Sequence, residues 1–141
     1  MTNDFILEEV DLNIITCLKE NARASFAEIG RKIKLSPSAT RERIHKLEER
    51  GVIKKYSVEL DNKLLGHDME AFILVKVFHG NLKRLFSYIS TKIEITEAHR
   101  ITGNQNVHLK VLLKNQIHLQ QLIDELMQFG DTSTFLILSK I

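Results

Sequence analysis

The apolar residues of this 141-residue chain change their spacing about a third of the way along. Up to about residue 51 they recur at every third or fourth position, as Val10, Ile14, Ile15 and Leu18 do, which is typical of one helix face. Beyond that point short alternating runs appear between helical runs, which is typical of half-buried strands. A helical first part followed by mixed strands and helices predicts an α+β protein.

Local capping signals divide the first part into three short helices. The first is expected from about residue 8 to 21. Ser25, with Glu28 three residues later, is a capping-box pattern that begins a second helix, which ends near residue 34. Ser36 and Pro37 begin a third helix, and Gly51 is the type of residue that ends one. Two helices joined by so short a turn predict a helix-turn-helix.

The run VIKKYSVEL, residues 52–60, alternates in hydrophobicity and predicts a short strand. With the three helices it suggests a winged helix-turn-helix, whose wing carries Lys54 and Lys55. The next segment, 61–68, is rich in turn residues and is expected to be a linker. An N-terminal domain of residues 1–60 is therefore expected before this linker.

The remaining residues, 69–141, predict the ferredoxin-like order β-α-β-β-α-β. Strands are expected at 71–78, 95–102, 106–114 and 132–141, and helices at 81–93 and 115–129. The last helix carries an apolar stripe that should be core: Leu119, Leu122, Ile123, Leu126 and Met127.

The first of these strands, AFILVKVF, is apolar on both of its faces. A single ferredoxin-like sheet leaves one face open, and here that face would bear Phe72, Leu74 and Phe78. An exposed patch of this kind is unusual on a monomer, so a second copy of the chain is expected to cover it.

The positive charge is concentrated in one segment, although the net charge is only +2. From Arg23 to Lys55 ten lysines and arginines stand against four acidic residues, whereas the numbers are eight and seven from His67 to Ile141. This excess indicates a surface that faces phosphates. No apolar run approaches the roughly 18 residues of a membrane span, and no signal peptide pattern begins the chain. The expected location is cytoplasmic, with no membrane partner.

The third helix divides into an apolar and a polar face. Thr40, Ile44 and Leu47 share the apolar side. The polar side carries Ser38, Arg41, Glu42, His45 and Glu49. The helix start suits a phosphate, arginine can bond guanine through two donors, and glutamate can accept from cytosine. The alternative at this point is a small helical interaction module with a charged exterior.

The chain resembles the Lrp/AsnC, or feast/famine, transcription regulators over nearly its whole length, about residues 7–141. In the first half the resembling elements are Asp11, Ile15, Asn21-Ala22-Arg23, Leu35-Ser36, Ser38, Arg43-Ile44, Leu47-Glu48, Gly51-Val52-Ile53, Tyr56 and Leu65-Gly66. In the second half AHRITGNQNVHLKV resembles the family's strand, TG-x-x-D loop and strand.

The resemblance implies a regulator that binds palindromic double-stranded DNA and dimerises through the sheet of its ferredoxin-like domain. It also implies assembly to tetramers or octamers and an amino-acid effector beside the TG-x-x-D loop, with no other cofactor. The DNA-binding residues so implied are Ser36, Ser38, Ala39, Arg41, Glu42, Arg43, His45, Lys54 and Lys55. The effector-binding residues so implied are Gly103, Asn104, Gln105, Asn106, Thr132 and Thr134.

Asn106 departs from the family pattern, which has aspartate at this position. An aspartate there would pair with the ammonium of an amino acid or hold the loop in shape. Asparagine keeps the hydrogen-bonding capacity and loses the charge. Three alternatives follow: a different effector, a weaker one, or a regulator without one. Gly103 is retained, and a positive φ or a close backbone approach would require it.

The sequence contains no nucleophile elbow, P-loop or dinucleotide-binding motif, so no catalytic residue is expected. None of the six histidines has metal-ligand spacing, although His99 and His108 would come close if their strands pair. Cys17 is expected to be a buried helix residue, with a redox switch as the alternative.

Sirohaem decarboxylases share the two-domain layout and are the enzyme alternative. A third alternative is an assembly protein that has lost DNA binding.

Overall fold

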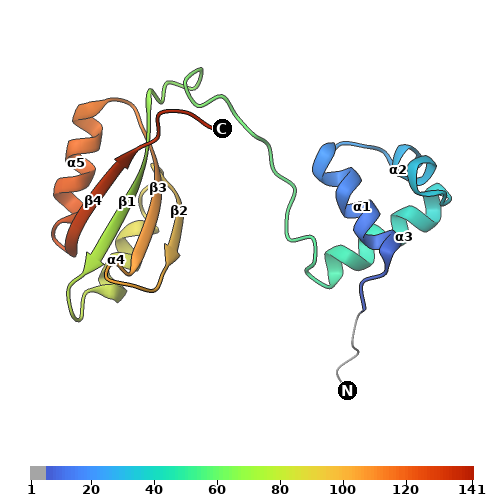
Figure 1. Ribbon diagram of the computed structural model, residues 1–141, viewed down its shortest axis with the longest axis horizontal. Coiled ribbons are helices and arrows are strands. Elements are labelled where there is room, and N and C mark those ends of the chain that lie inside the picture. The colour runs from blue at the N-terminus through green and yellow to red at the C-terminus, as the bar shows by residue number, and fades with distance from the viewer. Residues whose placement is uncertain (1–5) are drawn as a thin grey trace. The chain divides into compact units, whose positions relative to one another are not determined.

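Three helices form the first part of the molecule: α1 (Glu9–Glu20), α2 (Phe26–Ile33) and α3 (Pro37–Glu49). The computed structural model describes residues 6–141, and the chain divides into two compact units, Met1–Glu59 and Leu60–Ile141 (Figure 1). Within residues 6–141 no helix is long and apolar enough to cross a bilayer.

The first unit has a small core in which one apolar residue from each of α1 and α2 meets two from α3. Ile14, Ile29, Ile44 and Leu47 are buried. Half-buried residues complete this core: Ile15, Cys17, Leu18, Ala24, Ile33 and Ile53. The helical spacing therefore predicted the inward faces correctly, and Cys17 packs beside the core as a half-buried helix residue.

The turn between α2 and α3 brings the two helices unusually close. Gly30 is buried, and a Cβ atom built on it would lie 2.5 Å from the Leu35 carbonyl oxygen and 3.0 Å from the Thr40 Oγ1. The Leu35 N–H donates to the Gly30 carbonyl at 2.9 Å, and Lys34 ends α2 with a φ of +60°. Only a residue without a side chain at position 30 permits this approach.

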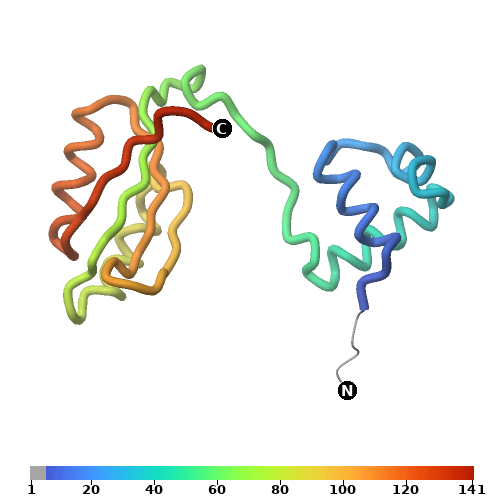
Figure 2. Tube along the Cα trace, viewed as in Figure 1, coloured from blue at the N-terminus to red at the C-terminus, as the bar shows by residue number. Residues whose placement is uncertain are grey.

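The expected wing strand at residues 52–60 does not form. A turn and a bend follow α3, and the chain from residue 54 to 60 has no regular structure. Figure 2 shows this stretch as an extended green trace. Its alternating pattern was a correct indication of extended backbone. A strand also needs a neighbour to receive its hydrogen bonds, and no other strand lies in this unit among the described residues.

The second unit has the expected β-α-β-β-α-β order. Its elements are β1 (Met69–Val77), α4 (Leu82–Ile89), β2 (Ile95–Arg100), β3 (Val107–Leu113), α5 (Gln116–Leu126) and β4 (Gly130–Leu136). The strands lie in the order β2-β3-β1-β4, and every neighbouring pair is antiparallel. A bulge interrupts the pairing of β2 with β3 between Ile95 and Glu97.

Both helices pack on one face of this sheet (Figure 1). Inward residues of β1 and β3, such as Ile73 and Leu109, are fully buried beneath them. The core stripe of α5 is present in Leu119, Leu122 and Leu126, with Ile123 packed at its side. Met127 is an exception to the predicted core, because α5 ends one residue earlier and the side chain is 57% exposed.

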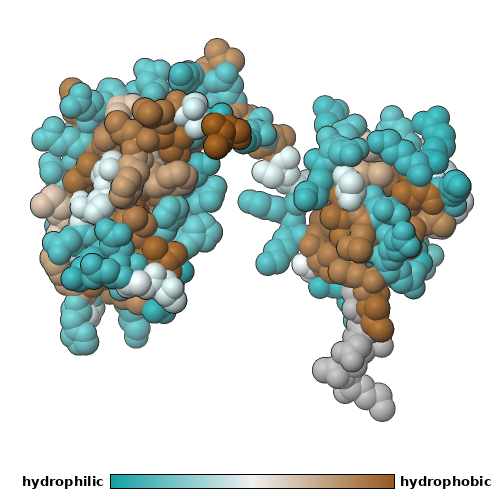
Figure 3. All heavy atoms as spheres, viewed as in Figure 1, coloured by the Kyte–Doolittle hydropathy of each residue, from teal (hydrophilic) through white to brown (hydrophobic). Residues whose placement is uncertain are grey.

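The other face of the sheet is open and partly apolar. Phe72 and Leu74 of β1 lie there beside His108 and Leu112 of β3, and all four are half-buried within the single chain. Phe135 of β4, opposite Phe72, is 53% exposed. Figure 3 shows apolar residues gathered over this unit between polar margins. The partly exposed apolar side chains on this face form a surface that a further layer of protein could cover.

A cluster of charged and aromatic groups connects α4 with α5. The Tyr88 hydroxyl donates to Glu125 Oε2 at 2.5 Å, and the Lys92 ammonium also pairs with that oxygen. The hydrogen bond from Lys92, followed by that from Tyr88, lowers the pKa of the Glu125 carboxyl. Burial, aided by the Glu125 carboxylate, raises the pKa of Tyr88. The two helices are thus joined through one ionised carboxylate.

Candidate nucleic-acid interface and ligand loop

The start of α3 is capped by its own residues. The Ser36 Oγ accepts from the Ala39 N–H at 3.1 Å and lies 3.1 Å from the Ser38 Oγ. Pro37 has no N–H, so the N–H of Ser38 is left to meet a phosphate. The helix start therefore offers the Ser38 amide and two exposed hydroxyls, while the Ala39 amide is taken up by the cap.

The outward face of α3 carries the predicted polar side chains, and all of them are exposed. Arg41 lies beside Glu42 and one turn before His45. Glu42 pairs with Lys46 at 3.0 Å and His45 with Glu49 at 3.2 Å. The hydrogen bond from Lys46 lowers the pKa of Glu42, so this side chain acts only as an acceptor at neutral pH. Exposed pairs of this type are weak and can exchange for a ligand.

A surface groove of about 580 Å³ runs along this face. Its apolar part comes from Phe26, Pro37 and Ile44. Its polar lining consists of Ser38, Arg41, Glu42, His45 and Glu48. Phe26 begins α2 and is 41% exposed. The sequence could have indicated that Phe26 is exposed. It directly follows the capping Ser25, so it lies at the helix start and outside the apolar stripe.

Arg43 differs from the other residues of the expected DNA-binding set. Its Nη1 donates to Asp11 Oδ1 at 2.9 Å, and its Nη2 donates to Glu8 Oε2 at 2.6 Å. The Asp11 side chain is only 4% exposed, and its second oxygen accepts from the Glu8 N–H at 3.0 Å. The guanidinium is therefore used within the unit, where it neutralises a buried carboxylate.

Lys54 and Lys55 are exposed in the irregular segment that follows α3. Close by, the Tyr56 hydroxyl donates to Glu48 at 2.7 Å. Burial, aided by the Glu48 carboxylate, raises the pKa of Tyr56 to about 12. This bond fastens the segment to the end of α3, so the two lysines remain near the helix without a wing strand.

The loop between β2 and β3 contains the TG-x-x-N stretch. Gly103 has a φ of +112°, which explains the glycine. The Asn106 Oδ1 accepts from the Val77 N–H at 2.9 Å, and the Asn106 N–H donates to the Val75 carbonyl at 3.1 Å. Asn106 therefore holds the loop against the end of β1. Its side-chain oxygen fills the shape-holding role that an aspartate would have.

The remaining residues of the expected effector set are only partly brought together. Gln105 Nε2 donates to Ser133 Oγ at 3.0 Å, which joins the loop to β4. Asn104 is exposed. Thr132 and Thr134 pair with the buried Val75 and Ile73, so they belong to the opposite face of β4 from Ser133.

The paired strands bring His99 opposite His108, with ring centroids 6.3 Å apart. This confirms that the two residues are neighbours. In the described part of the chain, no group of three or more histidine, cysteine or acidic residues is arranged to hold a metal ion.

Comparison with known proteins identifies both units. The AsnC-type helix-turn-helix domain matches residues 7–48, and the Lrp/AsnC ligand binding domain matches residues 70–141. The chain is 37% identical to the HTH-type transcriptional regulator LrpC of Bacillus subtilis over 96% of this chain and 94% of that protein. It is 33% identical to LrpB of the same organism over 96% and 91%.

Solved structures agree. The structure of B. subtilis LrpC has a TM-score of 0.92 and covers 96% of this chain and 97% of that chain. A transcriptional regulator of Neisseria meningitidis, solved as an L-Met complex, shares the fold with a TM-score of 0.89, 21% identity and coverage of 96% and 92%. These relatives are regulators rather than enzymes, which sets the decarboxylase alternative aside. The chain belongs to the Lrp/AsnC family of helix-turn-helix transcriptional regulators.

Proposed function

We propose that this regulator reads duplex DNA with the outward face of α3. Ser38, Arg41, Glu42 and His45 point away from the core and reach base edges in the major groove. The phosphates are contacted from two places. Ser36 and Ala39 lie at the start of α3, and Lys54 and Lys55 lie in the segment that follows it. Arg43 leaves this set, because Asp11 and Glu8 already bind it. The exposed, unburied polar face of α3 carries this proposal.

The domain roles follow the same division. Residues 1–60 bind DNA, 61–68 connect, and 69–141 bind the effector and join copies of the chain. The open sheet face around Phe72 and Leu74 is the dimer contact, and larger assemblies up to octamers are built from dimers. A two-fold dimer requires a palindromic site. The regulator acts where the chromosome is, in the cytoplasm.

The test is a genome-wide selection of bound fragments by the full chain, with and without a pool of amino acids. We expect enrichment of palindromic sites and an affinity that falls steeply with salt, since cationic side chains displace condensed counterions. Fragments bound without sequence preference at every salt concentration would contradict sequence-specific regulation. Sedimentation of the same sample measures the assembly, and a monomer at binding concentrations would contradict the dimer.

An amino acid or related small molecule is the proposed effector, bound at residues 103–106. Thr132 and Thr134 leave the expected set, because they lie on the other face of β4 from the Ser133 that contacts the loop. The L-Met complex of the Neisseria regulator makes methionine a suitable first probe. Asn106→Asp restores a charge beside the loop while keeping the oxygen that accepts from Val77. If an ammonium binds there, the variant should bind amino acids about tenfold more tightly in calorimetry. Unchanged affinity, or no binding by either protein, would point to an effector without an ammonium or to none.

A further inference from the structure

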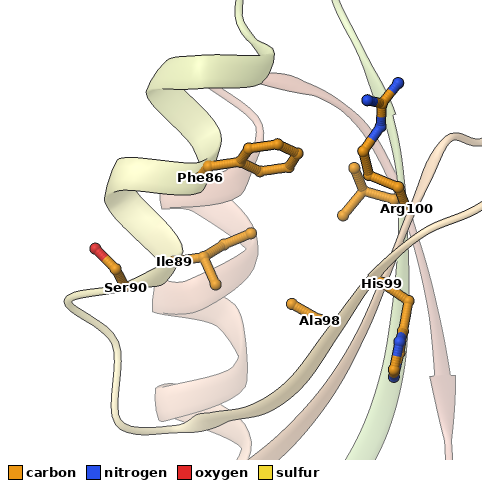
Figure 4. Close-up of a pocket in the computed structure, with 7 residues that line it drawn as sticks. Phe86, Ile89, Ser90, Ala98, His99 and Arg100 are labelled. Atoms are coloured by element: carbon orange, nitrogen blue, oxygen red, sulfur yellow. The ribbon is translucent and has the colours of Figure 1, made fainter. Parts of the chain in front are cut away.

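A pocket of about 360 Å³ lies between α4 and β2. Figure 4 shows Phe86 and Ile89 of α4 facing Ala98 and Arg100 of β2, while the ring of His99 turns away from the gap. The space exists because Ala98, opposite the buried Leu109, is too small to fill the distance to the helix. A larger apolar residue at this position would close it.

The lining is apolar with a cation at its edge. Phe86, Ile89, Ala98 and Val107 form the walls, and Ser90 and His99 complete the lining with Arg100. The Arg100 side chain is exposed, and no carboxylate within residues 6–141 is paired with it. A free guanidinium beside apolar walls suits a carboxylate, which it binds through two parallel hydrogen bonds.

The lining contains no acidic residue. The ammonium group of an amino acid would therefore lose part of its hydration without gaining a carboxylate partner. A small apolar acid that has an uncharged oxo or hydroxy group in place of the ammonium avoids this cost. The volume is near the lower end of ligand pockets, which suits a molecule the size of a branched-chain or aromatic acid.

We infer that the pocket between α4 and β2 binds small apolar 2-oxo or hydroxy acids, with Arg100 holding the carboxylate. The pocket shares no residue with the proposed effector set at the loop. Arg100 and Val107 are nonetheless cross-strand partners at the two ends of that loop. A ligand in the pocket contacts both of these residues and therefore lies next to the two ends of the segment 101–106, so the two sites are neighbours in the fold.

The experiment is calorimetry on the full chain with 4-methyl-2-oxopentanoate and, separately, with leucine, which has the same carbon skeleton. We expect the wild-type protein, which has Asn106, to bind the oxo acid at least tenfold more tightly than leucine. Arg100→Gln should weaken oxo-acid binding about tenfold, and Ala98→Leu should abolish it by filling the pocket. Lys114→Gln, which removes an exposed charge elsewhere in the same unit, should leave it unchanged.

Three results would overturn the inference: no saturable binding of the oxo acid, equal weakening in Lys114→Gln, or full binding by Ala98→Leu. Circular dichroism of each variant separates loss of binding from loss of fold. The outcome is independent of DNA recognition and of the loop site. DNA affinity without ligand should be the same in Arg100→Gln as in wild type, and Asn106→Asp should alter amino-acid binding alone.

Discussion

Asp11 of α1 and Arg43 of α3 form an ion pair of 2.9 Å in which the carboxylate is almost completely buried. The two residues are 32 positions apart in the sequence. The pair joins the first helix to the helix whose outer face is proposed to read DNA. It also gives an arginine on α3 a structural role within the first unit.

Arg43→Ala should therefore destabilise the first unit. It leaves Asp11 buried without a cation, and because Arg43 is itself partly exposed we expect a loss of about 2–3 kcal/mol in the free energy of unfolding. Urea unfolding followed by circular dichroism measures it. Arg41→Ala, on the exposed side of the same helix, is the control and should change stability by less than about 0.5 kcal/mol. Intact stability with lost DNA affinity would show instead that Arg43 contacts DNA.

Arg41 and Lys54 should affect DNA binding in different ways. Arg41→Ala should remove the preference for one base pair, a loss of about 1–3 kcal/mol at that position alone. Lys54→Ala should weaken every sequence alike and reduce the salt slope by about 1. Fluorescence anisotropy with a panel of single-base variants measures both. Lys83→Ala, an exposed charge on α4, is the control, and equal losses across the panel for both variants would reject this division of roles.

Gly30→Ala should loosen the helix-turn-helix. The added methyl group would meet a backbone oxygen at 2.5 Å, which cannot move without displacing the turn. We expect a net loss of about 1–3 kcal/mol, although alanine is the better helix former. Gly51→Ala is the comparison for backbone strain without a clash, because Gly51 has a φ of +71° and no atom lies within 4 Å of the added methyl group. A thermal melt in which Gly30→Ala equals wild type would contradict so close an approach of α2 and α3.

The stability of the second unit should depend on pH through Glu125. Because Lys92 and Tyr88 lower its pKa in the folded state, the folded protein binds the proton more weakly than the unfolded chain. This stabilisation is complete above the ordinary value of 4.5 and is lost as the pH falls through the lower folded-state pKa. Glu125→Gln should flatten the profile in this window and cost about 0.5–1 kcal/mol at neutral pH. Asp124→Asn, an exposed neighbour, should leave the profile unchanged.

Local signals were sufficient for most of the fold. Ser25 and Ser36 each cap the helix that the sequence assigned to them, because a cap involves only residues three positions apart. The sequence also placed Phe72 and Leu74 of β1 on the open face of the sheet, where the structure has both half-buried within the single chain. The wing strand failed for the opposite reason, since strand formation depends on a partner that the alternation of a single run cannot supply.

Fewer contacts of the candidate site could be predicted from the sequence. The outward face of α3 follows from its period, but the partner of Arg43 does not. A charged Asp11 inside the apolar stripe of α1 was the available hint, because an acid placed among core residues needs a cation. The role of Asn106 depends on the end of β1, 29 residues away, and Ala98 defines a pocket only once α4 lies opposite.

The bulge in β2 affects how readily a single protomer aggregates through the edge of its sheet before it assembles with another copy. It lies in an edge strand that also carries Glu97, His99 and Arg100. Irregular pairing and charge together make such an edge a poor template for an incoming strand. Aggregation by strand addition at this edge is thereby disfavoured, which leaves the apolar open face around Phe72 and Leu74 as the surface proposed to contact a second copy of the chain.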